Sequence, residues 1–312
     1  MARRVSVGLG IMELPFSGAD CFWRWIDLCE AGGVDSIWQS DRLIGKLPVL
    51  ESLSTMAALA GRTRRLKFGM NVVSLAFRDP VLLAKQCTTI DYLSGGRLLP
   101  AFGIGSPLGA EWKALGIDTA GRGRRADEAL EIIHRLWRED EVTFEGRHFR
   151  IQGAAIAPKP VQAELPMWIG GSSEAAIRRT ARFGTGWQAG AETPEEAAKV
   201  IAAIKLALAE TGRAIDEDHY GVNVPFRFGS IDEPGAQRAM DGYRQYIGRD
   251  PTRYFAIGDA ALMLDRIAAY IDAGAYKFVF RPVANGDDDM LDQTRSLIDE
   301  VLPKVARRWP HG

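Results

Sequence analysis

Cysteine is scarce in this 312-residue chain, which holds only Cys21, Cys29 and Cys87 and no CxxC pair. An odd and sparse set excludes a disulfide framework and is typical of the reducing cytoplasm. Long apolar runs are absent too, since no stretch approaches the ~18 consecutive apolar residues of a membrane-spanning helix. The opening MARRVSVGLG lacks the apolar run of a signal peptide, so we predict a cytoplasmic protein without membrane contact.

A surplus of positive charge is also missing. The formal net charge is −1, which argues against a nucleic-acid partner or an anionic membrane surface. The hydrophobic fraction of 46% and the charged fraction of 25% are those of a globular protein with a large core. We therefore expect a small-molecule substrate rather than a nucleic acid or a lipid surface.

Short strand-like runs alternate with longer helical segments along most of the chain. The expected strands are 5–10, 36–39, 66–71, 98–103, 167–170, 186–188, 220–226 and 277–281. This alternation predicts a parallel sheet with right-handed helical crossovers. Eight repeats of the unit predict an α/β fold, a single (β/α)₈ TIM-barrel domain over residues 1–312.

Two insertion segments interrupt the pattern, at about 139–164 and 228–258. The first contains VTFEGRHF, which predicts a β-hairpin, followed by a proline-rich stretch. The second reads as irregular and is rich in Gly, Arg and Tyr. Long excursions from a barrel are usually lids or binding loops, although some only cover the barrel end.

Active sites of such barrels form where the strands end. The segments expected there are 10–13, 39–42, 71–74, 103–106, 170–173, 188–192, 225–227 and 281–282. None of them holds a histidine, and no two carboxylates are clearly paired, so we predict no metal site and no nucleophile–base pair. A bound cofactor that carries its own reactivity fits such a site better than side-chain catalysis.

Two glycine-rich signals follow predicted strands. Gly103-Ile104-Gly105 is not a full dinucleotide fingerprint, because Leu108 stands where a final Gly or Ala is needed. The second, WIGGSS at 168–173, runs from a strand into a helix, where backbone N–H groups and hydroxyls can hold a phosphate. The alternative is a tight turn whose serine only caps the helix, and the residues alone leave both interpretations open.

Longer motifs spread over most of the chain carry a family resemblance. They are GVDSIWQSDRL (33–43), DPVLLAKQCTTIDYLSGGRL (79–98), FGIG (102–105), RGRRADEALEIIHRLW (122–137), FEGRHF (144–149), PKPVQ (158–162) and LPMWIGGSSEAAIRRTARFGTGW (165–187). Together they resemble the luciferase-like flavin-dependent oxidoreductases, which include FMN monooxygenases and enzymes that use coenzyme F420. The resemblance implies a (β/α)₈ barrel with an insertion before the fifth strand and a cofactor in the barrel mouth. It also suggests a homodimer.

The resemblance implies residue roles by position. The cofactor-binding residues would be Gln39, Asp41, Asn71, Val72, Gly103, Gly105, Gly170, Gly171, Ser172 and Ser173, the last four at its phosphate. Asn71 and Val72 would be joined by a non-proline cis peptide behind the ring. Asn71, Ser106 and Arg42 are the expected catalytic polar groups near the ring. For the substrate we expect an anionic group on Arg281 and an apolar wall from Trp187.

Two departures from the family guide the expected chemistry. Members that oxidise sugar phosphates or alcohols with F420 usually have His where Arg42 stands, and the sugar-phosphate members have an acid in place of Ser106. The leading hypothesis is therefore a monooxygenase that uses reduced FMN and O₂ on a small organic substrate. A separate flavin reductase would supply the reduced FMN. The alternatives are F420-dependent hydride transfer and a non-catalytic flavin-binding protein.

Overall fold

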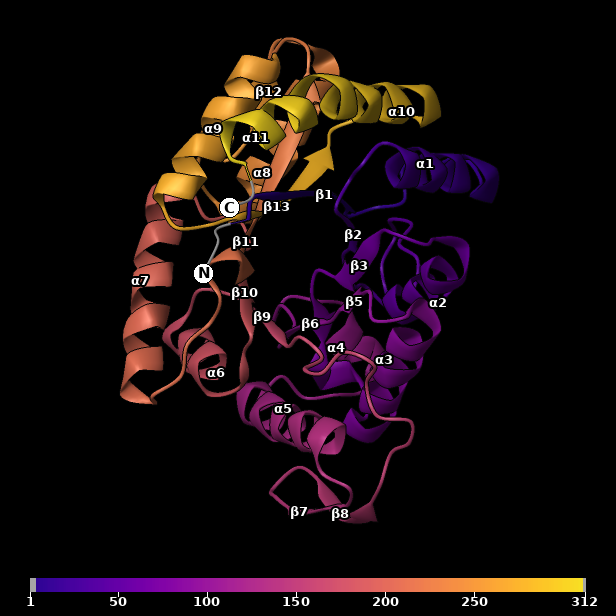
Figure 1. Ribbon diagram of the computed structural model, residues 1–312, viewed down its shortest axis with the longest axis vertical. Coiled ribbons are helices and arrows are strands. Elements are labelled where there is room, and N and C mark those ends of the chain that lie inside the picture. Colours follow the sequence, from indigo (N-terminus) through magenta and orange to yellow (C-terminus); the bar gives the residue numbers. More distant parts are fainter. Residues whose placement is uncertain (1–3, 311–312) are drawn as a thin grey trace.

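The computed structural model describes residues 4–310 of the chain, in which helices surround a central curled sheet (Figure 1). The strands of this sheet are β1 (Ser6–Ile11), β2 (Ser36–Gln39), β3 (Lys67–Met70), β4 (Val73–Ser74), β5 (Leu98–Leu99), β6 (Ala101–Gly103), β9 (Trp168–Gly170), β10 (Gly186–Gln188), β11 (Tyr220–Phe228), β12 (Ala256–Gly258) and β13 (Lys277–Pro282). Every pairing in it is parallel, as the alternation of strands and helices predicts.

The sheet closes on itself through two interrupted strands. Its order is β4-β6-β9-β10-β11-β13-β1-β2-β3-β5, with β12 added beside β11. Between β5 and β6 stands Pro100, which has no N–H for the ladder, and between β3 and β4 stand Asn71 and Val72. β3 and β4 are two halves of one interrupted strand, and β5 and β6 are two halves of another. Because β3 pairs with β5 and β4 pairs with β6, the same two strands stand at both ends of this order, and the sheet is closed. The predicted eight-stranded barrel is confirmed.

Most of the helices that follow the strands begin with a side-chain cap. The helices around the barrel are α1 (Ala19–Ala31), α2 (Ser52–Arg62), α3 (Pro80–Ser94), α5 (Arg122–Arg138), α6 (Glu174–Phe183), α7 (Pro194–Glu210), α9 (Ala260–Asp272) and α10 (Asp287–Ser296). Thr193 and Glu196 form a capping box at the start of α7, and the Asp259 side chain caps α9. Each of these helices follows a loop that leaves the C-terminal end of a strand.

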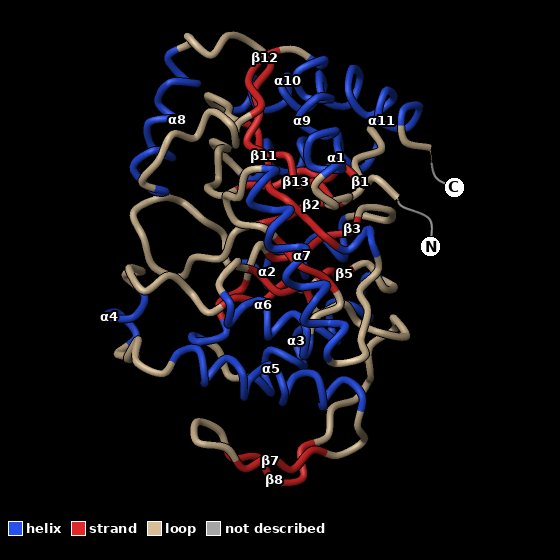
Figure 2. Tube along the Cα trace, turned by 90° about the vertical axis from the view of Figure 1, so that its left-hand side faces the viewer, coloured by secondary structure: helices blue, strands red, loops and turns tan. Residues whose placement is uncertain are grey.

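Shorter elements complete the chain. They are the 3₁₀ turns Leu75–Phe77 and Glu217–His219, α4 (Glu111–Leu115), the π-helix Leu297–Val301 and α11 (Leu302–Arg308). The predicted hairpin is present as β7 (Val142–Glu145) and β8 (Arg150–Ala154), which lie at one end of the molecule (Figures 1 and 2). Within residues 4–310, no helix is both long and apolar enough to cross a bilayer.

The expectation of an irregular segment at 228–258 is wrong. This segment forms α8 (Pro234–Ile247), which starts with proline at its first turn and ends at Gly248 in the left-handed conformation. Ala236 and Met240 of α8 are buried, and Ala239 and Tyr243 pack with them against Tyr254 and neighbouring residues. These positions have the i, i+3, i+4, i+7 spacing of a short helical face, which was missed among the Gly, Arg and Tyr residues of the segment. Figure 2 shows α8 and α4 on the same side of the molecule.

A buried ion pair holds the opposite end of the barrel. The Lys277 ammonium, at the start of β13, bonds the carboxylate of Asp35, just before β2, and their side chains are 6% and 10% exposed. Burial alone would raise the pKa of Asp35, but Lys277 outweighs it and holds that pKa well below its usual range. The two strands on either side of β1 are thus tied together where they begin.

Candidate active site

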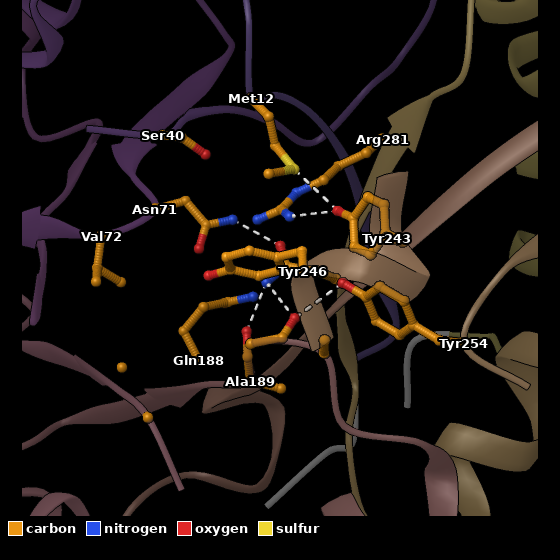
Figure 3. Close-up of a pocket in the computed structure, with 15 residues that line it drawn as sticks. Met12, Ser40, Asn71, Val72, Gln188, Ala189, Tyr243, Tyr246, Tyr254 and Arg281 are labelled. Carbon is orange, nitrogen blue, oxygen red and sulfur yellow. Dashed lines mark hydrogen bonds between the residues drawn. The ribbon is translucent and has the colours of Figure 1, made fainter. Parts of the chain in front are cut away.

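Four adjoining cavities open where the strands end. The central cavity, about 260 Å³, is surrounded by the ends of β3, β9, β10 and β13, by the middle of β11 and by α8 (Figure 3). The outer cavity, about 670 Å³, continues from it over the 40–45 and 103–111 loops. The α6 cavity, about 260 Å³, lies at the start of that helix, and the side cavity, about 690 Å³, lies between 10–15 and 282–290.

Asn71 occupies the centre of this arrangement. Its Nδ2 donates to Asn223 Oδ1 at 2.6 Å, and Asn223 Nδ2 in turn donates to the carbonyl of Ala189 at 2.5 Å. Asn223 is almost fully buried, so this chain of amides sets the orientation of the Asn71 side chain. Sequence reasoning identified Asn71 but not Asn223, which stands in mid-strand rather than at a strand end.

Val72 explains two of the predicted glycines. The peptide bond between Asn71 and Val72 is cis, as the resemblance implies. A Cβ on Gly103 would come within 2.5 Å of Val72 Cγ2, and one on Gly170 within 2.9 Å of Val72 Cγ1. Both strand ends therefore need glycine for Val72 to reach the floor of the cavity between them.

The Gly-Gly-Ser-Ser turn caps α6 and leaves the phosphate interpretation open. Ser173 caps α6 by accepting from Ala176 N–H at 3.3 Å, and the Ser172 hydroxyl bonds the carboxylate of Glu192. Gly171 has φ +103°, a conformation that favours glycine, and with Ser172 and Ser173 it lines the α6 cavity. The remaining N–H groups at this positive helix end can still bind a phosphate oxygen.

Two predicted contacts are not brought to the cavities. Trp187 is fully buried and lines none of the four, and its indole N–H donates to the Gly171 carbonyl at 2.8 Å, so it supports the turn from behind. Gln39 is likewise buried and away from them, and its amide bonds the Leu50 carbonyl. The expected substrate wall from Trp187 and the expected ring contact from Gln39 are corrected to supporting roles.

Asp41 lines the outer cavity, but its carboxylate is already engaged. Arg78 donates to both carboxylate oxygens, each at 2.7 Å, and Ser52 and the Ser74 N–H add two more hydrogen bonds. This saturation makes Asp41 a support for the loop and leaves no free oxygen for a ligand. Arg42, the next residue, is exposed and lines both the outer and the side cavity.

The loop after β6 brings an unexpected acid to the outer cavity. Trp112 Nε1 donates to the Ser106 carbonyl at 2.7 Å, which folds the loop back on itself. The neighbouring Glu111 is only 8% exposed, lines the outer cavity, and has no ion pair within residues 4–310. Ser106 lines the same cavity. The chain thus lacks a carboxyl group at position 106 but brings the carboxyl group of Glu111 to the same cavity.

Gln188, at the end of β10, is the clearest unsatisfied polar group in the central cavity. It is 1% exposed, and neither Oε1 nor Nε2 has a hydrogen-bond partner within the described chain. Figure 3 shows the amide directed toward the middle of the cavity. A buried amide left unpaired costs about 1–3 kcal/mol, which a polar ligand would recover. The strand-end rule includes Gln188, but nothing in its local sequence marks it further.

Aromatic residues from the second insertion close the other side of the central cavity. Arg281 Nη1 lies 3.3 Å from the Tyr243 hydroxyl, which also lies 2.8 Å from Met12 Sδ (Figure 3). The Tyr254 hydroxyl donates to the Gly190 carbonyl at 2.8 Å. Burial raises the pKa of Tyr254 well above its ordinary value, so this hydroxyl stays protonated at neutral pH. Tyr243 was missed because its helix was not predicted, and Tyr254 lies in the turn that follows that helix.

Comparison with known proteins places this geometry in a family. The model of the luciferase-like monooxygenases matches residues 17–294, and the chain belongs to that family. An uncharacterized protein of Mycobacterium tuberculosis is 36% identical over 167 residues, which cover 53% of this chain and 57% of that protein. An F420-dependent glucose-6-phosphate dehydrogenase of Microbacterium testaceum is 27% identical over 90% of this chain and 92% of its own.

Further similarities include monooxygenases and an F420-dependent dehydrogenase. A 4-hydroxyprotoasukamycin monooxygenase of Streptomyces nodosus is 30% identical over 78% of this chain and 70% of its own. The fold matches a monooxygenase of Streptomyces bottropensis with a TM-score of 0.84 at 19% identity, covering 96% of this chain and 100% of the other. An F420-dependent secondary alcohol dehydrogenase gives 0.82 at 18%, covering 96% and 98%. The chain thus belongs to a family whose members include monooxygenases and F420-dependent dehydrogenases, and it spans little more than half the length of the first of these relatives.

Proposed function

We propose that the protein is a monooxygenase that uses reduced FMN and O₂ to oxygenate a small organic substrate. The observation that carries the proposal is the composition of the central cavity. Its polar side chains are Ser40, the amides of Asn71, Gln188 and Asn223, three tyrosines and Arg281, with no carboxylate or imidazole. Such a site can orient and hydrogen-bond a flavin ring but offers no tuned base for an alcohol hydroxyl.

The residues fit the cofactor. Gln188 supplies an unpaired buried amide, and Val72 with Gly103 and Gly170 forms a floor that side chains would otherwise fill. In this proposal Gly170, Gly171, Ser172 and Ser173 hold the phosphate at the start of α6, while Asn71, Gln188 and Gly105 face the ring. Bound FMN supplies two-electron reduction of O₂. The chain's part is to position the substrate and to exclude water, with Ser106 and Arg42 toward the outer cavity.

Electrons would come from a separate flavin reductase. Gly103-Ile104-Gly105 forms the end of β6 and the loop over the cavity rather than a dinucleotide site, consistent with its incomplete fingerprint. A homodimer in the cytoplasm remains part of the proposal on family resemblance.

The test combines binding with oxygen consumption. FMN affinity is measured by flavin fluorescence, and O₂ uptake is followed with NADH, a general flavin reductase, catalase and candidate substrates. We expect O₂ uptake above the reductase background that depends on substrate, and incorporation of ¹⁸O from ¹⁸O₂ into the product. A protein that binds FMN without any substrate-dependent uptake would contradict the proposal and support a flavin carrier.

F420-dependent hydride transfer is the second candidate, and Glu111 is the observation in its favour. This buried carboxyl group lines the outer cavity and is free of ion pairs in the described chain, so it is placed to exchange a proton with a substrate. Under this alternative, reduction of F420 by substrate would proceed without O₂ and would lose most of its rate in Glu111→Gln. Following the 420-nm absorbance anaerobically decides between the two.

A further inference from the structure

Arg281 has no acidic partner within the described residues, in contrast to three other partly buried arginines near the barrel mouth. These three are each paired at 2.5–3.1 Å: Arg78 with Asp41 and Glu51, Arg179 with Asp127, and Arg227 with Glu233 and Asp289. Within residues 4–310, Arg281 makes one hydrogen bond, of 3.3 Å, to the neutral Tyr243 hydroxyl. A cation withdrawn from water without a counter-ion is costly, so this position is prepared for an anion from outside the chain.

Tyr243 provides a second donor at the same point. Its hydroxyl donates to Met12 Sδ at 2.8 Å, and a thioether is a weak acceptor that a ligand oxygen would readily replace. Arg281 comes from the end of β13 and Tyr243 from α8, so the two donors converge from different elements (Figure 3). An arginine fork beside a hydroxyl matches the two oxygens of a carboxylate.

The side cavity next to this pair is suited to an apolar body. Arg281 and Tyr243 line both the central and the side cavity. The side cavity, about 690 Å³, has apolar walls that include Leu14, Leu47, Pro282, Val283 and Met290. Its charged lining consists of Arg281, Arg42, Arg238 and one acid, the exposed Glu13. The surplus of arginine attracts an anion toward the opening.

We propose that the substrate is a monocarboxylic acid with an apolar body, held by Arg281 and Tyr243 at its carboxylate and by the side cavity along its body. The inference rests on the proposed function for the identity of the ligand as substrate, but carboxylate recognition by this pair is independent of the cofactor. The carboxylate is thereby fixed where the central and side cavities meet.

The test measures binding by calorimetry to the full chain without cofactor. The probes are hexanoate, octanoate and phenylacetate, each compared with its own primary amide, which keeps the shape and removes the charge. At least one acid should bind about tenfold or more tightly than its amide. Arg281→Met should remove this preference and Arg281→Lys should keep part of it. The matched control Arg178→Met, on the exposed face of α6, removes the same charge elsewhere and should keep it in full.

The outcomes separate this inference from the proposed reaction. Equal affinity for all three acids and their amides, or an unchanged preference in Arg281→Met, overturns the inference. Circular dichroism checks that the variants fold, and Tyr243→Phe, which keeps the ring packing, should still lower acid affinity if Arg281→Met does not fold. Acid binding without substrate-dependent O₂ uptake leaves the inference standing and contradicts the monooxygenase. O₂ uptake that responds equally to acids and amides contradicts the inference and leaves the monooxygenase proposal standing.

Discussion

Asn71 Nδ2 and Asn223 Oδ1 lie 2.6 Å apart although 152 residues separate them in the chain. Asn223 is itself held by the carbonyls of Ala189 and Gly190, so its oxygen is fixed as an acceptor and points at Asn71. The contact joins the end of β3 to β11 across the barrel mouth. It leaves the Asn71 oxygen as the side chain's free acceptor for a ligand N–H.

Asn223→Ala should therefore weaken cofactor binding without touching the cofactor. We expect about a tenfold loss of FMN affinity, because Asn71 is freed to rotate, and a loss of about 1–3 kcal/mol in the free energy of unfolding from the unpaired groups left behind. Fluorescence titration and urea unfolding measure the two effects. Asn285→Ala, at an exposed loop, is the control. Unchanged FMN affinity in a destabilised Asn223→Ala would show that Asn71 does not need its partner.

The turn before α6 gives a second prediction. In Gly171→Val/Ser172→Ala, a β-branched residue must adopt φ +103° and one hydroxyl is lost, so the N–H groups above α6 move out of place. FMN and F420 affinity should both fall at least tenfold, while far-ultraviolet circular dichroism stays that of the parent. Ser172→Ala alone keeps the backbone and should have a smaller effect. Parental affinity of the double variant for both cofactors would reject the phosphate site.

Gln188→Leu tests whether an unpaired buried amide is kept for binding. Leucine removes two unsatisfied polar atoms from a nearly fully buried position, so the free energy of unfolding without ligand should stay level or rise by about 1 kcal/mol. FMN affinity should nevertheless fall at least tenfold. Gln293→Leu is the converse control, because the Gln293 amide is fully hydrogen-bonded to the backbone of Phe228.

That control should lose stability and keep its affinity for FMN. If Gln188→Leu instead lowers stability and leaves FMN affinity intact, Gln188 is a packing residue and does not contact the cofactor. The two measurements are urea unfolding without ligand and fluorescence titration with FMN, both made on the same preparations.

The barrel and the strand-end loops could be predicted because both depend on local patterns. Alternating strands and helices determine the sheet, and the WIGGSS turn carries its own glycines and cap, as the Ser173 hydrogen bond shows. Side-chain direction is harder. All four residues of β2 are buried, so no in–out alternation tells that Gln39 points away from the cavities. Trp187 was misplaced for the same reason on β10.

Contacts between distant segments could not be predicted at all. Tyr243 meets Arg281 from α8, whose short apolar pattern at 236, 239, 240 and 243 does not tell against which part of the barrel the helix packs. Glu111 reaches the outer cavity only because Trp112 folds its loop back on Ser106. Tyr243 of α8 and Glu111 of the loop after β6 thus add polar groups that the strand ends lack, and the conformation of both segments depends on packing against the barrel.

The buried ion pair of Asp35 and Lys277, at the end of the barrel where the strands begin, offers a stability test that is separate from the candidate active site. Asp35→Asn should lower the free energy of unfolding by about 3–5 kcal/mol at pH 7, because Lys277 then remains buried without its counter-ion. The pKa of Asp35 is lower in the folded protein than in the unfolded chain. Its contribution is therefore complete above the unfolded value of about 3.9 and is lost as pH falls below it.

Urea unfolding of parent and variant between pH 7 and pH 2.5 measures this dependence, and the difference between the two curves should be constant above about pH 4 and should narrow steadily below it. The double variant Asp35→Asn/Lys277→Met is the matched control, because it removes the stranded charge and lets an apolar chain pack near Trp38. It should recover most of the lost stability at pH 7. A double variant no more stable than Asp35→Asn would mean that the cost arises from altered packing around β13 and not from the unpaired ammonium.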